Sequence, residues 1–136
     1  MNSKPARFKS ISLTFRGFEL PPQEVESIVG FPASTLGTRG KPVKPGVRTL
    51  LTRSFAYYSI EFPNGCRLDE MIPALLTHLG GVKHLCEVRD KVLPEFFEID
   101  FVLPIKRSEE QEGGFLPPAT IADVNLLKAS LSFQFL

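Results

Sequence analysis

The segment that decides the fold is residues 10–22, whose sequence is SISLTFRGFELPP. Its first seven residues alternate polar and apolar side chains, and the apolar ones are Ile11, Leu13 and Phe15. This period of two is typical of a strand that buries one face and exposes the other. The two prolines predict the start of a helix, because a proline at the first helical position lacks only an N–H that has no partner there. We therefore expect a strand followed directly by a helix that ends at Gly30.

The same order recurs near the other end of the sequence. Residues 97–103 alternate again, and residues 114–118 end in the same Leu-Pro-Pro as residues 18–22. An acidic loop at 108–114 separates the two features, and residues 131–135 carry a last alternating pattern. Each Leu-Pro-Pro thus introduces a helix that leads towards a further strand.

The middle of the chain supplies another strand at 55–62 and two helices. The first helix is expected to be capped by Asp69, with Pro73 in its first turn, and the second covers residues 82–92. Residues 31–53 hold either a functional loop or a small hairpin. We expect one α+β domain over residues 1–136, with a ferredoxin-like fold. Its two βαβ halves would form a four-stranded, mainly antiparallel sheet with helices on one face and a helical pair inserted between the halves.

The composition sets limits on the class of protein. Hydrophobic residues make up 43% of the chain and charged residues 23%, which is typical of a globular domain. The net charge of +1 gives no general attraction to nucleic acid or membranes. Cys66 and Cys86 form neither a CxxC pair nor a disulfide framework, and no apolar run reaches the ~18 residues of a membrane span. We expect a cytoplasmic protein.

Three further segments are LPPQEV at 20–25, GFPAS at 30–34 and RGKP at 39–42. Together with the helical pair and the closing helix–strand unit, they resemble a bacterial family known as domain of unknown function 4279. The family usually has a tryptophan in the second strand, where this sequence has Tyr57 and Tyr58. The resemblance implies a small α+β domain without an assigned activity, cofactor or catalytic residue. Some members are candidate immunity proteins that neutralise a toxin.

Three carboxylates are expected on the sheet face opposite the buried residues, among serines, threonines and Tyr57: Glu61, Glu98 and Asp100. Paired carboxylates can hold a metal or divide acid and base roles. A solvent-facing sheet also needs polar side chains, and exposed carboxylates keep ordinary pKa values. We interpret this face as an acidic surface that suits a basic protein partner, and not as an RNA-reading face, which would need stacked aromatics beside basic residues.

A second candidate surface is the basic loop 39–53. No acid occurs between Ser27 and Ile60, whereas cations recur at five positions: Arg39, Lys41, Lys44, Arg48 and Arg53. The glycines and hydroxyl side chains around them could cradle a phosphate. The spacing matches neither a P-loop nor GxGxxG, and the same composition describes a solvated loop.

The sequence contains no clear catalytic or metal motif. His78, His84, Cys66 and Cys86 have no ligand spacing, so we expect neither a metal nor a cofactor. No serine lies in a GxSxG elbow. The hypothesis that follows is a non-enzymatic protein-binding module, immunity-like in character, which uses the acidic face or the basic loop. The alternative is an enzyme or sensor that binds a phosphorylated metabolite through loop 39–53. A third hypothesis is nucleic acid binding through the same loop. Open sheet edges would also allow a homodimer.

Overall fold

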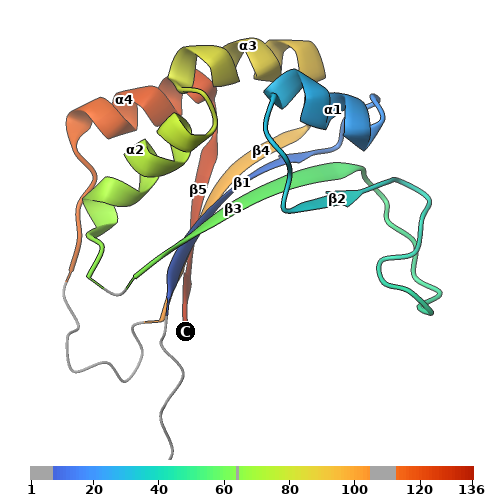
Figure 1. Cartoon of the computed structure of the whole chain (residues 1–136), viewed down its shortest axis with the longest axis horizontal. Coiled ribbons are helices and arrows are strands. Elements are labelled where there is room, and N and C mark those ends of the chain that lie inside the picture. The colour runs from blue at the N-terminus through green and yellow to red at the C-terminus, as the bar shows by residue number, and fades with distance from the viewer. Residues whose placement is uncertain (1–7, 64, 105–112) are drawn as a thin grey trace, which may run out of the picture.

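The computed structural model describes residues 8–63, 65–104 and 113–136, which form an α+β fold with one mixed five-stranded sheet and four helices. The helices lie on one side of the sheet and leave the other side uncovered (Figure 1). The strand order across the sheet is β2-β3-β1-β4-β5. In chain order the elements are β1 (Lys9–Arg16), α1 (Pro22–Val29), β2 (Thr35–Gly37), β3 (Phe55–Phe62), α2 (Leu68–His78), α3 (Val82–Val92), β4 (Phe96–Leu103), α4 (Pro118–Leu127) and β5 (Ser130–Phe135).

The predicted ferredoxin-like fold with four mainly antiparallel strands and two βαβ halves is wrong. β3 runs antiparallel to β1, so the first three predicted elements do not make a βαβ unit. β4 and β5 are parallel neighbours joined through α4, which makes the sheet mixed. The fifth strand, β2, lies in segment 31–53, which was expected to hold either a functional loop or a small hairpin, and it pairs with β3. The Leu-Pro-Pro echo is local, and strand pairing is decided by contacts far apart in the chain.

Local patterns predicted the individual elements well. Both Leu-Pro-Pro segments precede a helix, since α1 begins at Pro22 and α4 at Pro118. Gly30 ends α1 with a left-handed backbone, as expected, and its N–H donates to the carbonyl of Glu26. Asp69 does not cap α2, because the helix begins one residue earlier and the Asp69 carboxylate accepts a bond from the Arg67 side chain.

Of two further predictions, the position of Pro73 is wrong and the acidic loop lies almost entirely outside the described residues. Pro73 lies inside α2 and not in its first turn. The acidic loop predicted at 108–114 lies outside the described residues except for its last two glycines. Within 8–63, 65–104 and 113–136, no helix has both the length and the apolar character required to cross a membrane.

The core lies between the sheet and the helices. Ile11, Leu13 and Phe15 of β1 are fully buried, as the alternation predicted. They face the apolar residues of β3 and β4 on either side and the inner faces of the helices. The Phe15 ring packs against Phe97, with 4.7 Å between ring centroids, and edge-on against Tyr58 at 6.2 Å. The central strand therefore organises the core.

The Tyr58 hydroxyl is buried, and no residue in the described part of the chain accepts or donates a hydrogen bond to it. An unpaired buried hydroxyl costs about 1–3 kcal/mol. We expect Tyr58→Phe to raise the free energy of unfolding by about 1 kcal/mol in urea titrations. Tyr57→Phe on the opposite sheet face is the matched control, with no gain expected. A loss of stability in Tyr58→Phe would show that the hydroxyl has a partner.

Burial, reinforced by the Glu26 carboxylate, raises the pKa of Tyr58 well above its ordinary value of about 10. Above that pH the unfolded chain releases the phenolic proton while the folded chain keeps it, so the free energy of unfolding falls as pH rises. This contribution is expected to disappear in Tyr58→Phe, and the same titrations repeated across this range measure it.

Candidate functional site

The polar side chains predicted on one sheet face do share that face. Directly opposed residues point to the same side, and the register pairs Thr14 with both Tyr57 and Glu98, and Ser12 with Asp100. Glu61 lies on the same face opposite Ser10. The four helices lie on the other side, so no helix of the described residues covers this polar face (Figure 1).

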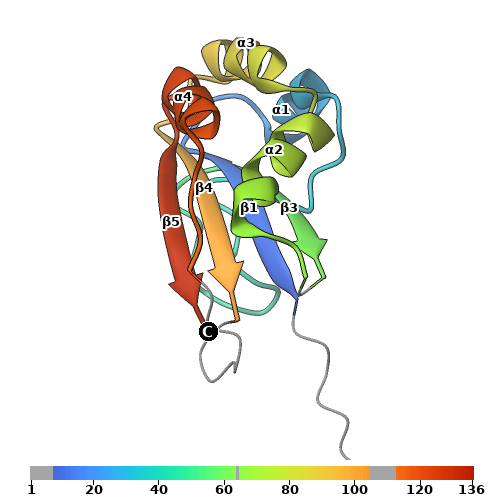
Figure 2. The ribbon, with the colours of Figure 1, turned by 90° about the vertical axis from the view of Figure 1, so that its left-hand side faces the viewer.

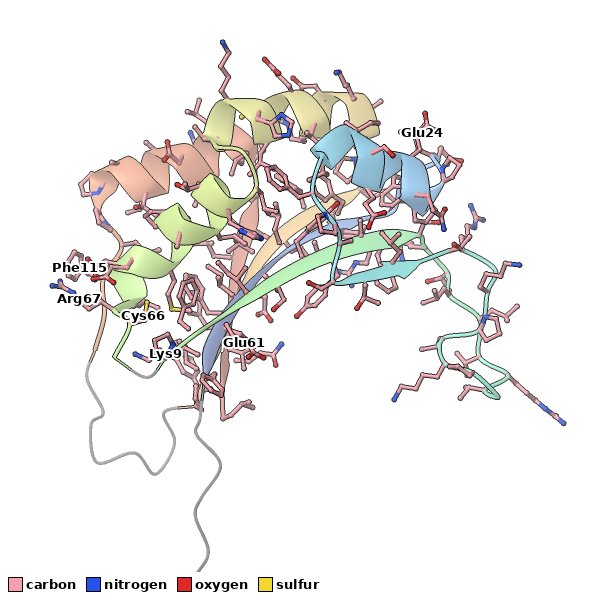
Figure 3. All side chains as sticks on the ribbon, in the orientation of Figure 1. Lys9, Glu24, Glu61, Cys66, Arg67 and Phe115 are labelled. Atoms are coloured by element: carbon pink, nitrogen blue, oxygen red, sulfur yellow. The ribbon has the colours of Figure 1, made fainter. Side chains whose placement is uncertain are left out.

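Two of the three predicted carboxylates already have partners within the protein. Glu98 forms an ion pair with Arg16 of β1. Asp100 accepts hydrogen bonds from Ser132 Oγ at 2.6 Å and Gln134 Nε2 at 2.9 Å, which come from the neighbouring strand β5. Glu61 stands apart from them, near the far end of β3 (Figure 3). The sheet face is therefore less strongly acidic than its composition suggested, and the three carboxylates do not converge on one point.

The predicted basic loop is an ordered hairpin, which we call the basic arm (residues 39–53). Its two sides are joined by backbone hydrogen bonds from Gly40 to Leu51, from Leu51 to Lys41 and from Val43 to Thr49. Of the two alternatives left open by the sequence, the hairpin is the one that forms. The arm extends away from the helices and the body of the sheet (Figure 1).

Four of the five predicted cations stand on the arm without a carboxylate partner among the described residues. Arg39, Lys41, Lys44 and Arg48 are exposed, and no ion pair within the described ranges includes any of them. The fifth, Arg53, pairs with Glu95 at 3.1 Å. Exposed apolar side chains lie between the cations at Val43, Val47 and Leu50. The arm therefore combines unneutralised positive charge with uncovered apolar surface.

A hollow of about 430 Å³ lies where the base of the arm meets the open sheet face. The Phe96 ring in its lining is approached by two guanidinium groups, with Arg16 Cζ and Arg53 Cζ each 5.1 Å from the ring centroid. Cation–π contacts of this kind hold arginines in place and leave some of their N–H groups free for a ligand. The lining residues are Arg16, Leu51, Thr52, Arg53, Phe55 and Phe96.

Three residues of this site were not predicted from the sequence: Arg16, Phe55 and Phe96. The register explains why they meet, because Arg16 is opposite Phe55 of β3 and Phe96 of β4 at the same end of the sheet. One signal was present: Phe96 continues the polar side of the 97–103 alternation, so an aromatic stands where a polar residue is expected. Phe55 is further held over Gly37 of β2, where any Cβ would overlap its ring.

The histidines and cysteines have structural contacts. A His84 ring nitrogen lies 2.7 Å from the Val29 carbonyl and links α3 to the end of α1. The Cys86 thiol donates to the Leu126 carbonyl of α4. Burial raises the pKa of the Cys66 thiol, with Glu70 adding to the effect, whereas a nucleophilic cysteine needs a lowered pKa. No group of three or more His, Cys, Asp or Glu side chains with metal-binding geometry occurs among the described residues.

No protein-family model, curated protein or solved structure matches this sequence. The features that bear on its function are the basic arm, the hollow at Phe96 and the open sheet face.

Proposed function

We propose that this chain is a non-enzymatic protein-binding module that docks an acidic segment of a partner protein on the basic arm and the adjoining hollow. The observation that carries the proposal is the arm itself. It holds Arg39, Lys41, Lys44 and Arg48 in an ordered, projecting hairpin, and none of them is paired within the described ranges. Complementary charge steers a partner to such a surface and fixes its orientation. An immunity protein that covers its toxin is one kind of module in this class.

The apolar side chains of the arm favour a protein over a simple anion. Val43, Val47 and Leu50 stay exposed beside the cations, and burying them requires a partner with apolar surface of its own. The hollow adds Phe96 and two arginines, and aromatic and arginine side chains dominate the binding energy of many protein interfaces. An acidic peptide segment with one or two apolar residues matches both features.

The open sheet face limits the kind of partner that can bind beside the arm. Glu98 lies next to the hollow through its ion pair with Arg16, and Asp100 lies farther along β4, where β5 holds it. A long polyanion such as a nucleic acid duplex would bring phosphates against these carboxylates, whereas a short segment can place its acidic residues along the arm and an apolar residue in the hollow. The charge pattern therefore supports a protein ligand over nucleic acid.

A phosphorylated small molecule is the second candidate, and the convergence of Arg16 and Arg53 at Phe96 is the observation that favours it. The observation against a phosphorylated ligand is that both arginines are already paired, Arg16 with Glu98 and Arg53 with Glu95. If this candidate holds, inorganic phosphate or a phosphometabolite raises the melting temperature, and Arg53→Ala removes the shift. The peptide-docking proposal predicts no shift with phosphate at millimolar concentration.

The test is a pull-down from the lysate of the cells that make the protein. The tagged chain is incubated with nuclease-treated lysate at low and moderate salt, with and without soluble polyglutamate. We expect a stoichiometric protein that survives nuclease and is displaced by polyglutamate, because the polymer competes for the same cations. A partner that polyglutamate does not displace would contradict docking on the basic arm, and a partner lost with nuclease would point to nucleic acid.

A further inference from the structure

The last strand forms one margin of the sheet. β5 pairs with β4, and in the strand order nothing among the described residues lies beyond it. Seen from the side, β5 runs along the outer boundary of the sheet while α4 lies above its beginning (Figure 2). One edge of β5 therefore presents backbone groups to the surroundings.

The hydrogen bond at the end of the strand shows which groups these are. The Leu136 N–H donates to the Leu103 carbonyl of β4. In a strand, the N–H and C=O of one residue point to the same side and successive residues alternate. Ser132 and Gln134 therefore turn their backbone towards β4. The backbone groups of Leu131, Phe133 and Phe135 point outward.

The same three residues carry apolar side chains. They lie opposite Ile99, Phe101 and Leu103, on the core side of the sheet. The Phe133 ring stacks on Phe101 at 4.9 Å and on Phe135 at 6.2 Å. Even so, Phe133 remains 42% exposed and Phe135 48% exposed. The core continues to the margin of the sheet and ends there with two partly exposed aromatic rings.

The charge of this margin is also unusual. Residues 129–136 include no lysine, arginine, aspartate or glutamate. Free edge strands are ordinarily protected by charge, proline or a bulge, and β5 has neither a charge nor a proline. A second copy of the chain brings the same neutral surface, so like charges do not oppose the contact. The other margin, β2, is only three residues long and lies beside the basic arm, which repels its own copy.

We propose that β5 pairs antiparallel with β5 of a second copy around a two-fold axis at Phe133, and so continues the sheet from one copy into the next. In this register Phe133 faces Phe133 of the second copy, and Leu131 faces Phe135 of the second copy. Both outward-pointing backbone groups of each residue then find partners. The apolar side chains of the two strands share one face, and Ser132 and Gln134 share the other.

The test is the mass of the purified chain, measured by light scattering or sedimentation over a range of concentrations. The wild type is expected at twice the 15.2 kDa of one chain. Phe133→Pro removes an outward N–H without touching the β4 ladder, and Phe133→Lys places two like charges together at the axis. Both variants are expected to be monomeric at concentrations where the wild type is a dimer. Leu93→Lys, at an exposed apolar residue after α3, is the matched control and is expected to stay dimeric.

A wild type that is monomeric throughout, or variants that remain dimeric, would overturn the proposal. Assemblies larger than a dimer would also overturn it, since they indicate open-ended pairing of unlike edges. If neither Phe133 variant folds, hydrogen exchange of the wild type decides whether β5 pairs with a second copy. Pairing predicts protection of the Leu131, Phe133 and Phe135 amides that increases with concentration, and fast exchange at all concentrations would exclude it.

Discussion

Replacing both Lys44 and Arg48 with glutamate is expected to reduce partner affinity by roughly 100-fold, about 2.7 kcal/mol. These two residues lie on the exposed part of the basic arm, and neither is paired with a carboxylate in the described ranges. Their reversal turns attraction towards an acidic segment into repulsion. The backbone hydrogen bonds that form the arm do not involve the side chains, so the hairpin is expected to persist. Capture from lysate followed by titration of the purified partner measures the effect.

The matched control reverses two cations on α3, outside the basic arm. Lys83→Glu with Lys91→Glu changes the net charge by the same amount, and both residues are exposed on α3. Both i,i+4 pairs with Glu87 change from attraction to repulsion, which costs this helix about 1–2 kcal/mol at most. The control is expected to bind like the wild type. Equal loss of binding in both variants would show that net charge matters and the arm does not.

Phe15→Ala is expected to lower the free energy of unfolding by about 3–5 kcal/mol, which is the cost of removing a large aromatic side chain from a closed core. Phe15 is fully buried in the central strand and touches aromatic rings of both neighbouring strands. Since small domains are stable by only about 5–15 kcal/mol, the variant is expected to be close to unfolding at ordinary temperatures.

Urea titration followed by circular dichroism measures this change. Leu93→Ala, at a site 75% exposed after α3, serves as control and is expected to change stability by about 0.5 kcal/mol or less. A loss below about 1 kcal/mol in Phe15→Ala would mean that the packing of β1 against the helices is much looser than the structure shows.

The sequence was informative wherever the signal is local. The alternation around Phe15 predicted β1 and its buried face, and the proline pairs predicted where α1 and α4 begin. The strand order could not be predicted in the same way, because it depends on which strands meet across the sheet. β2 is only three residues long, too short for a period to be recognised, and the parallel pairing of β5 with β4 leaves no mark in either strand.

In the candidate site, too, the features that depend on a local pattern could be predicted, and those that depend on contacts across the sheet could not. The shared face of Glu98 and Asp100 follows from a period of two, and the positive charge of the arm is visible in composition. The ion pair of Glu98 with Arg16 and the hydrogen bonds from β5 to Asp100 require the register, which no local pattern contains. The hollow at Phe96 joins the beginning of β4 to the base of the arm, and its two arginines are far apart in sequence.

Hydrogen exchange of the chain with and without its captured partner tests the central claim most directly. If the basic arm and the hollow form the docking surface, partner binding slows exchange at the amides of residues 39–53 and around Phe96, while α1 to α4 are unchanged. Protection confined to the helices, with the arm exchanging as fast as in the free protein, would contradict the proposed docking surface.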